Sequence, residues 1–203
     1  TKYLGVLQEL RLVERRVPAT VPPNLAHRSK QGRYHLLDPF HRFYFRFLRP
    51  YQAEVAYQPD RVLEQIQSGL RAFVGQTAWE ELARSWVFHQ GLRGTLAFAP
   101  EVIGSHWDRS VQADVVAVSW RERALLVGEC KWGADAVTRQ ELRRLLEHTL
   151  PRTVAALPQD GGGWRVVPAL FARAGATPDA AALLREQGGL LVDLLTLYAG
   201  LAV

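Results

Sequence analysis

Three charged residues on two apolar segments have the types and the spacing of a site for a metal ion and a phosphate group. Asp114 lies in the segment 111–120, and Glu129 and Lys131 end the segment 123–132. Two carboxylates beside an ammonium group are side chains with which hydrolytic sites hold a divalent cation and a phosphate. The structural alternative for the same residues is a salt bridge at a strand end.

The turn between the two segments decides whether these side chains can meet. If the segments pair as antiparallel strands around a four-residue turn, 120–123, the register sets Asp114 directly opposite Glu129. Opposed residues carry Cβ atoms about 5 Å apart on one face, and Lys131 shares that face because side chains alternate with period two. Opposed carboxylates destabilise a sheet, whereas a Mg²⁺ or Mn²⁺ ion between them would reverse the sign of the interaction.

The composition favours an anionic partner such as DNA, because the net charge is +5. Only three of the 25 basic residues are lysines. A lone Lys131 in an arginine-rich region therefore suggests a task for a compact ammonium group, with chance as the alternative. The single cysteine, Cys130, excludes an internal disulfide and a cysteine-based zinc site. No apolar run approaches the ~20 residues of a membrane span, and no signal peptide is present, so we expect a cytoplasmic protein.

The first 50 residues predict part of a winged helix. A helix ending near Leu10 precedes a short strand, a proline-rich loop and a second short strand, and Asp38-Pro39 opens the next helix. The loop would be the wing. Three basic residues in it are expected to contact a DNA backbone: Arg28, Lys30 and Arg33. The aromatic row from Phe40 to Phe47 is expected to pack in a core or between domains.

The rest of the chain predicts an α/β fold in which helices flank a mixed sheet. Helices are expected at 59–73 and 76–90, separated at Gly75. A strand broken at Pro100 precedes the two site strands. A helix interrupted at Pro151 then follows, and after it come two further strands separated by a helix. This alternation favours parallel pairing toward the end of the chain.

Glu80 is the candidate for a further acid at the site. At ~100° per residue it lies on the margin of the buried stripe of its helix, whereas Glu81 points toward water. The alternative for Glu80 is a helix-start carboxylate favoured by the helix dipole. His106 lies near the hairpin, but a packing or surface role is the favoured interpretation. The helix after the site strands carries Arg139 and Arg143, which either track phosphates or form a solvated face.

The same residues resemble those of a known superfamily. The pattern of Glu80 on a helix, Asp114 on one strand, and Glu129-Cys130-Lys131 on the next looks like the PD-(D/E)XK nucleases. The local amino-acid sequence is similar to that of the C-terminal region in a family of prokaryotic, largely archaeal-type, AAA-like P-loop ATPases. The segments that carry this similarity are GRYHLLDPFHRFYFRFLRP, FVGQTAWEEL, HWDRSVQADVVAV and LLVGECKWG.

The resemblance implies how the chain is organised. Residues 1–55 would be a partial winged helix and linker helix, and residues 56–203 a PD-(D/E)XK domain with a restriction-endonuclease-like mixed sheet. The family region is the C-terminal part of a larger protein, and this chain contains no methionine. We therefore expect that an N-terminal ATPase domain is missing from it. No Walker A pattern occurs, so no P-loop is expected within this chain.

The resemblance also implies roles for the site residues. Asp114, Glu129 and the backbone carbonyl of Cys130 would hold Mg²⁺ or Mn²⁺, Lys131 would orient or activate the attacking water, and Glu80 would support them. Ala113-Asp114 stands where the superfamily has Pro-Asp. Gln140 is a weak match to a glutamine that helps the metal site in some relatives. The expected function is a metal-dependent nuclease-like domain acting on DNA. The alternatives are a catalytically silent DNA-binding or regulatory module and a purely structural interaction domain.

Overall fold

The chain forms two compact units in a computed structural model that describes residues 2–201. One unit joins the residues up to Val17 with Lys30–Ala78, and the other joins Pro18–Ser29 with the residues from Trp79 onward. This division lies later than the boundary expected after residue 55. Helix α5 (Pro59–Val74) belongs to the first unit, because the ring of its Phe73 packs 5.3 Å from that of Phe47.

The first unit contains the expected order of a helix, two strands and further helices. Strands β1 (Val13–Arg16) and β2 (Arg33–Leu36) pair antiparallel over four residue pairs, which confirms the predicted hairpin. Asp38 accepts a hydrogen bond from the Phe40 N–H at 2.7 Å, as predicted for a helix N-cap followed by proline. The other elements of this unit are α1 (Lys2–Glu9), α3 (Pro39–Phe43), η1 (Tyr44–Leu48), η2 (Arg49–Tyr51) and α4 (Glu54–Tyr57).

The aromatic row packs in part within this unit. The rings of Phe43 and Phe47 lie 5.2 Å apart, and Phe47 is buried. Phe40 and Phe45 are more than half exposed. The predicted packing is thus confirmed for Phe43 and Phe47, whose rings face α5. It is not confirmed for Phe40 and Phe45.

Two expected boundaries differ from the structure. No helix break occurs at Gly75, whose φ of −61° and ψ of −41° are helical, and a π-helical turn, η3 (Gly75–Trp79), leads into α6 (Glu80–Leu92). The Thr77 hydroxyl donates to the Phe73 carbonyl at 2.6 Å, which satisfies a carbonyl at this wider turn. Residues 95–101 form no strand; β3 (Val102–Trp107) begins only after Pro100, which lacks an N–H for a ladder.

The second unit is built on a five-stranded mixed sheet in the order β3-β4-β5-β6-β7. Strands β4 (Gln112–Ser119) and β5 (Ala124–Lys131) continue an antiparallel meander from β3. Strands β6 (Arg165–Ala172) and β7 (Leu190–Val192) add in parallel, as the alternation of strands and helices predicted.

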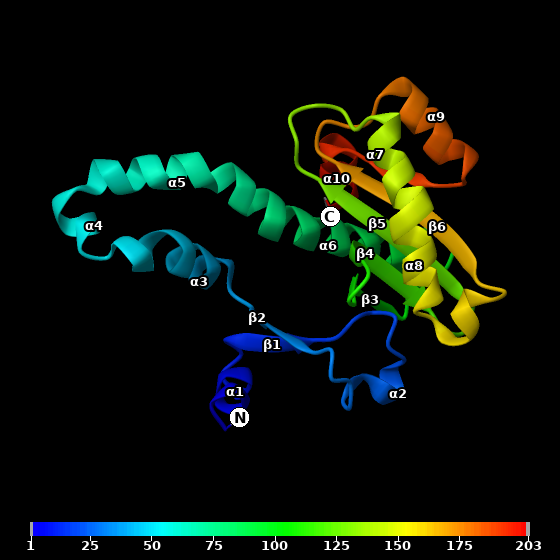
Figure 1. The fold of residues 1–203 in the computed structure, drawn as a ribbon, viewed down its shortest axis with the longest axis horizontal. Helices are drawn as coiled ribbons and strands as arrows, with labels where there is room; N and C mark the ends of the chain where they lie inside the picture. The colour runs from blue at the N-terminus through cyan, green and yellow to red at the C-terminus, as the bar shows by residue number, and fades with distance from the viewer. Residues whose placement is uncertain (1, 202–203) are drawn as a thin grey trace. The chain divides into compact units, whose positions relative to one another are not determined.

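Helices cover both faces of this sheet (Figure 1). One core includes Leu142 of α7 (Arg139–Arg144) and Leu184 of α9 (Pro178–Glu186), and the other includes Trp86 of α6 and Leu197 of α10 (Leu194–Leu201). A π-helical turn, η4 (Leu145–Thr149), stands before Pro151, where the interruption was expected. The remaining helices are α2 (Pro23–Ala26), α8 (Leu150–Ala155) and η5 (Pro158–Gly161). Within residues 2–201, no helix has the length and apolarity to cross a bilayer.

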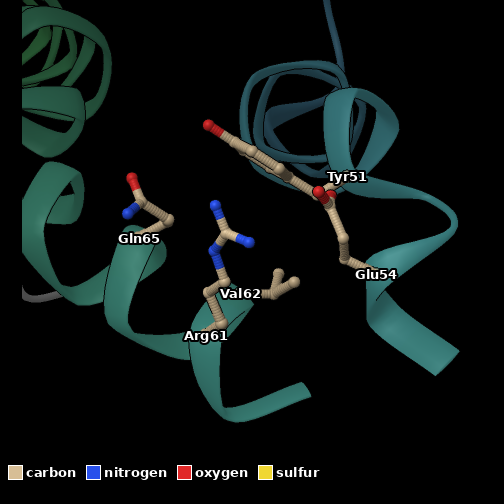
Figure 2. Close-up of a pocket in the computed structure, with 5 residues that line it drawn as sticks. All are labelled: Tyr51, Glu54, Arg61, Val62 and Gln65. Carbon is tan, nitrogen blue, oxygen red and sulfur yellow. The ribbon is translucent and has the colours of Figure 1, made fainter. Parts of the chain in front are cut away.

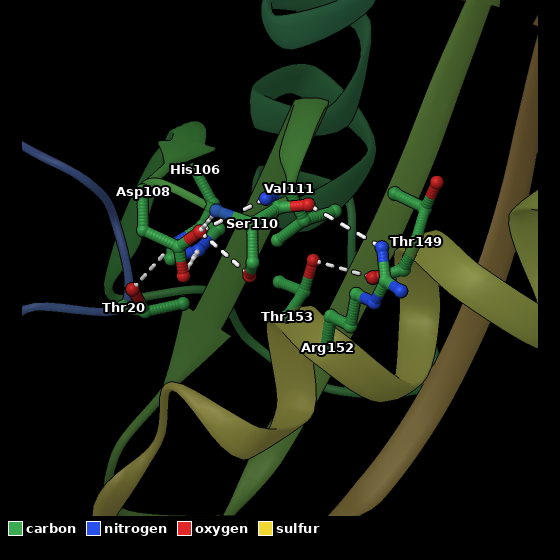
Figure 3. Close-up of polar contacts among 8 residues, drawn as sticks. All are labelled: Thr20, His106, Asp108, Ser110, Val111, Thr149, Arg152 and Thr153. Atoms are coloured by element: carbon green, nitrogen blue, oxygen red, sulfur yellow. Dashed lines mark hydrogen bonds and ion pairs between the residues drawn. The ribbon is translucent and has the colours of Figure 1, made fainter.

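A polar network with Thr20 and His106 as its buried members ties the segment before α2 to the edge strand β3 (Figure 3). The Ala19 N–H donates to the Ser105 carbonyl at 2.9 Å, and Thr20 Oγ1 lies 2.8 Å from His106 Nδ1. His106 Nε2 lies 3.3 Å from Asp108 Oδ2. The other oxygen of Asp108 accepts from the Ser110 N–H, the Ser110 hydroxyl and the Val111 N–H. His106 is 2% exposed, so its contacts agree with the packing role favoured from the sequence.

Replacing Asp108 by alanine is expected to destabilise the fold by roughly 1 kcal/mol at pH 7, less than the shift of its pKa alone would give, because solvent screens this exposed carboxylate. Burial raises the pKa of Asp108, but hydrogen bonds from Ser110, Val111 and His106 outweigh it and lower the pKa to about 2. The charged carboxylate therefore stabilises the fold above about pH 4, and this contribution is lost as the pH falls toward 2.

Urea unfolding of wild type and Asp108→Ala at pH 7 and pH 2 measures this effect. The difference in free energy of unfolding should shrink at pH 2, and Asp135→Ala, in an exposed loop, is the control. An equal loss at both pH values would contradict the assignment.

Candidate functional site

The register of β4 against β5 matches the one deduced from the turn. Ser119 pairs with Ala124, and the ladder continues to Val115 opposite Gly128. Asp114 and Glu129 are the next residues outward on the two strands. The Cys130 N–H donates to Asp114 Oδ2 at 2.9 Å, so the Asp114 carboxylate reaches the end of β5.

Strand β5 changes from fully buried to half-buried at the site. Residues 124–128 are buried, whereas Glu129, Cys130 and Lys131 are partly exposed. A Cβ atom at Gly128 would lie 2.8 Å from the Phe171 ring and 3.1 Å from Val115 Cβ, so only glycine fits between these neighbours. The strand therefore delivers its charged end to the carboxyl edge of the β5–β6 pair, where open α/β sheets place their sites.

The lysine and one carboxylate of the predicted trio are in direct contact. Lys131 Nζ lies 3.0 Å from Glu129 Oε1, and the two side chains are 39% and 25% exposed. Adjacent half-exposed partners of this kind contribute little to stability, about 0–1 kcal/mol. The pair matches the structural alternative of a strand-end salt bridge, and it also keeps the ammonium group beside the carboxylates.

Arg84 is a member of the site that sequence reasoning missed. Its guanidinium donates to the Asp114 carbonyl at 2.7 Å and lies 3.6 Å from Glu80 Oε2 and 3.3 Å from Glu81 Oε1. The spacing of three and four residues from these two acids on one helix was the available signal. The expectation that Glu81 points to water is therefore wrong, because Glu81 is partly buried against Arg84.

Burial and a neighbouring carboxylate raise the pKa values of Asp114 and Glu80. Burial, followed by the charge of Glu129, raises the pKa of Asp114 to about 6, against the opposing effects of the Cys130 N–H, Lys131 and Arg84. Burial, followed by the charge of Asp114, raises the pKa of Glu80 to about 7, although Arg84 lowers it. The negative charges of these neighbouring carboxylates repel one another, and a bound cation would relieve this repulsion.

The donor groups fit a hard divalent cation. Cys130 directs its N–H toward β4, and the N–H and C=O of one strand residue point to the same side, so its carbonyl also faces the side of Asp114. The Lys131 carbonyl accepts from the N–H of Arg173, the residue that follows β6, as this alternation requires. Two carboxylates with a carbonyl and waters suit Mg²⁺ or Mn²⁺. Among residues 2–201, no three His, Cys, Asp or Glu side chains gather as a metal site by themselves.

Two of the basic residues predicted to contact DNA lie on the helix that follows the site strands. Arg139 and Arg143 are exposed on α7, which a capping box between Thr138 and Glu141 begins. Arg143 and Gln140 line a surface depression of about 490 Å³ along α7 and η4. Their roles remain predictions.

The predicted wing residues are divided between the two compact units. Arg28 belongs to the second unit, whereas Lys30 and Arg33 belong to the first, and Arg33 pairs with Arg16 across the hairpin. All three predicted residues are exposed. Their contact with a DNA backbone remains a prediction.

A separate small cavity of about 90 Å³ lies in the first unit (Figure 2). The residues that line it come from η2, α4 and α5: Tyr51, Glu54, Arg61, Val62 and Gln65. A water molecule takes about 30 Å³ in the liquid, so the cavity has room for a few waters and not for a nucleotide. We therefore treat the carboxylates at the end of β5, and not this cavity, as the candidate site.

Replacing Asp114 by asparagine is expected to stabilise the cation-free protein at pH 7.5, because it removes a buried charge opposed to Glu129. The amide oxygen can still accept from the Cys130 N–H. We expect the melting temperature in EDTA to rise by about 2–4 °C for each kcal/mol gained. Addition of Mn²⁺ or Mg²⁺ should raise the melting temperature of wild type and leave that of Asp114→Asn unchanged.

Thermal unfolding with and without the cation provides this comparison. Glu186→Gln, which removes an exposed charge at the end of α9, should respond to the cation as wild type does. An equal cation response in wild type and Asp114→Asn would exclude Asp114 as a ligand.

Comparison with known proteins identifies relatives without assigning an activity. A profile of DUF234, described as archaea bacterial proteins of unknown function, matches residues 44–145, half of the chain. The matched range contains all four predicted acidic and lysine residues: Glu80, Asp114, Glu129 and Lys131.

A distant relative matches a longer part of the chain. An uncharacterized protein of Methanocaldococcus jannaschii is 29% identical over 132 residues, which are 65% of this chain and 29% of that protein. The matched part of the chain thus spans less than a third of the relative's length. No solved structure matches the chain.

Proposed function

The chain belongs to the DUF234 family of archaea and bacterial proteins of unknown function, and we propose that its second unit is a PD-(D/E)XK nuclease-like domain that hydrolyses DNA. One observation carries this proposal. The β4–β5 register and the hydrogen bond from Cys130 bring Asp114 to the strand end that bears Glu129 and Lys131. The mixed sheet flanked by helices is the architecture that such a domain requires.

The groups at the strand end would have separate roles in hydrolysis. Asp114, Glu129 and the Cys130 carbonyl would hold Mg²⁺ or Mn²⁺, which when bound stabilises negative charge developing on the phosphate oxygens. Lys131 donates hydrogen bonds to a phosphate oxygen or to the attacking water from its Nζ atom. Both positions lie within reach of a flexible four-carbon side chain that is 39% exposed.

Glu80 supplies a group that can take up a proton near neutral pH. Burial and the neighbouring Asp114 raise its pKa to about 7, close to the value that suits a general base in a neutral solution. As water attacks phosphorus, its proton passes to a carboxylate oxygen of Glu80. The bond from phosphorus to the leaving oxygen breaks, and that oxygen takes a proton from solvent water. Arg84 lies 3.6 Å from Glu80 and keeps this carboxylate beside the backbone of Asp114.

The relative's greater length supports a place for this chain within a larger protein. We propose that the chain corresponds to the C-terminal part of an AAA-like P-loop ATPase, with residues 1–55 providing part of a winged helix. The β1–β2 hairpin between helices supports the winged-helix interpretation. In this arrangement the ATPase would be linked to DNA, and its hydrolysis of nucleotide lies outside this chain.

The contact between Lys131 and Glu129 favours a second candidate function. An ammonium group bonded at 3.0 Å to a carboxylate has its charge partly neutralised within the protein, as in a structural ion pair. A domain that keeps this pair closed would bind DNA or regulate the ATPase without cleaving the strand. In the nuclease, Lys131 would be needed for cleavage of DNA. In the silent module, it would be needed only for binding.

Replacing Lys131 by alanine is expected to reduce cleavage of supercoiled DNA at least a hundredfold, because it removes the group that orients water or phosphate. Conversion of supercoiled plasmid to nicked and linear forms, with Mg²⁺ or Mn²⁺, measures this activity. Arg185→Ala, exposed at the end of α9, removes one positive charge elsewhere and should cleave as wild type does.

Binding measured in EDTA separates the remaining outcomes. Cleavage by wild type and not by Lys131→Ala supports the nuclease. Salt-sensitive DNA binding without cleavage by either protein overturns the nuclease and favours the silent module. Absence of both binding and cleavage favours a structural interaction domain.

A further inference from the structure

Arg173 stands at the end of β6 in a setting different from that of the other arginines near the site. Its guanidinium carbon lies 4.9 Å from the centre of the Trp132 ring, close enough for a cation–π interaction. Trp132 in turn packs 5.2 Å from Trp79, which is fully buried and donates from Nε1 to the Phe171 carbonyl at 3.0 Å. The arginine is thus held against a rigid aromatic support.

The backbone places Arg173 at the same sheet edge as Lys131. In the parallel ladder Lys131 pairs with Ala172, and the Arg173 N–H donates to the Lys131 carbonyl at 2.9 Å. Carboxyl ends of adjacent parallel strands meet at one edge, so Arg173 and Lys131 supply two positive charges there. Trp132 follows Lys131 directly and packs with Trp79 on the α6 face of the sheet. Lys131 continues the other face, that of Leu125 and Val127, so the two positive charges lie on either side of the same strand end.

The charge of Arg173 has no acidic partner among the described residues 2–201. Arg84 is engaged by Glu80 and Glu81, and Lys131 by Glu129. Arg165, at the opposite end of β6, also lies over an aromatic ring, that of Phe98 at 5.9 Å, but it has Glu122 at 3.5 Å. One stacked arginine begins β6 and the other directly follows it, and only Arg173, at the site edge, lacks a carboxylate partner within residues 2–201.

We propose that Arg173, held against Trp132, binds a backbone phosphate of the DNA strand beside the phosphate that Lys131 contacts. A guanidinium stacked by its face presents its N–H edge, which matches two oxygens of a phosphate in a forked contact. Stacking also restricts the side chain before binding, so less conformational entropy is lost when the phosphate arrives. Arg173 is therefore a substrate-binding residue, and its role rests on the proposed function in DNA hydrolysis.

Arginine is the usual basic residue of this chain, and at position 173 its planar group also suits the proposed contact. The edge would contain one compact ammonium group at Lys131 for the reacting phosphate and one planar fork at Arg173 for its neighbour. Lysine at position 173 would keep the charge but lose both the forked contact and much of the stacking on Trp132.

Equilibrium binding of a fluorescent DNA duplex, measured by anisotropy in EDTA over a series of salt concentrations, tests the proposal. Arg173→Ala should weaken binding about tenfold and lower the slope of log affinity against log salt by about 1, as expected for one lost phosphate contact. Arg173→Lys should recover the salt slope but only part of the affinity. Arg165→Ala is the matched control, because it removes an equal charge from the other end of the same strand.

The outcomes separate this proposal from the proposed function. Binding by wild type and Arg165→Ala, with the loss confined to Arg173→Ala, supports a phosphate contact, provided that melting temperatures remain within a few degrees. Equal affinities and salt slopes for Arg173→Ala and Arg165→Ala overturn the contact while leaving DNA hydrolysis intact if wild type cleaves. Failure of wild type to bind or cleave DNA overturns both.

Discussion

Antiparallel pairing of β4 with β5 determines which charged groups of this protein can act together. The ladder runs from Ser119 opposite Ala124 to Val115 opposite Gly128, and Asp114 and Glu129 are the next residues outward on the two strands. A slip of one residue would turn every side chain of one strand to the other face and separate the two carboxylates. The four-residue turn and the fit of Gly128 between Phe171 and Val115 oppose such a slip, because a larger residue in place of Gly128 would clash there. The pairing of the strands in the sheet therefore sets the positions of the site residues.

This arrangement concentrates charge where the surroundings disfavour it. The pKa of Asp114 is raised to about 6 and that of Glu80 to about 7, in both cases first by burial and then by a neighbouring carboxylate. Arg84 and Lys131 offset only part of the repulsion. A fold that places acids together at a strand end, with a backbone carbonyl on the same side, gives up stability that a cation can restore. Such local conflict is common at functional sites.

The sequence allowed much of this site to be predicted, because the relevant information was local. Apolar alternation and a four-residue turn sufficed to oppose Asp114 and Glu129, and the mixed sheet followed from the order of strands and helices. Arg84 was missed although its spacing from Glu80 signalled the contact. Arg173 could not have been found in this way, since its position beside Lys131 depends on the parallel register of β6, which no local pattern specifies. The helical continuity at Gly75 was also missed, because glycine tolerates a π-helical turn as readily as a break.

The central claim is that Asp114, Glu129 and the Cys130 carbonyl together hold a divalent cation. Anomalous diffraction from crystals of this chain grown with Mn²⁺ measures this most directly, because the signal locates the ion without reference to activity. We expect an anomalous peak bounded by the two carboxylates and the Cys130 carbonyl, with Lys131 beside it. Crystals saturated with Mn²⁺ that show no peak there, and in which Glu129 remains paired only with Lys131, would contradict it.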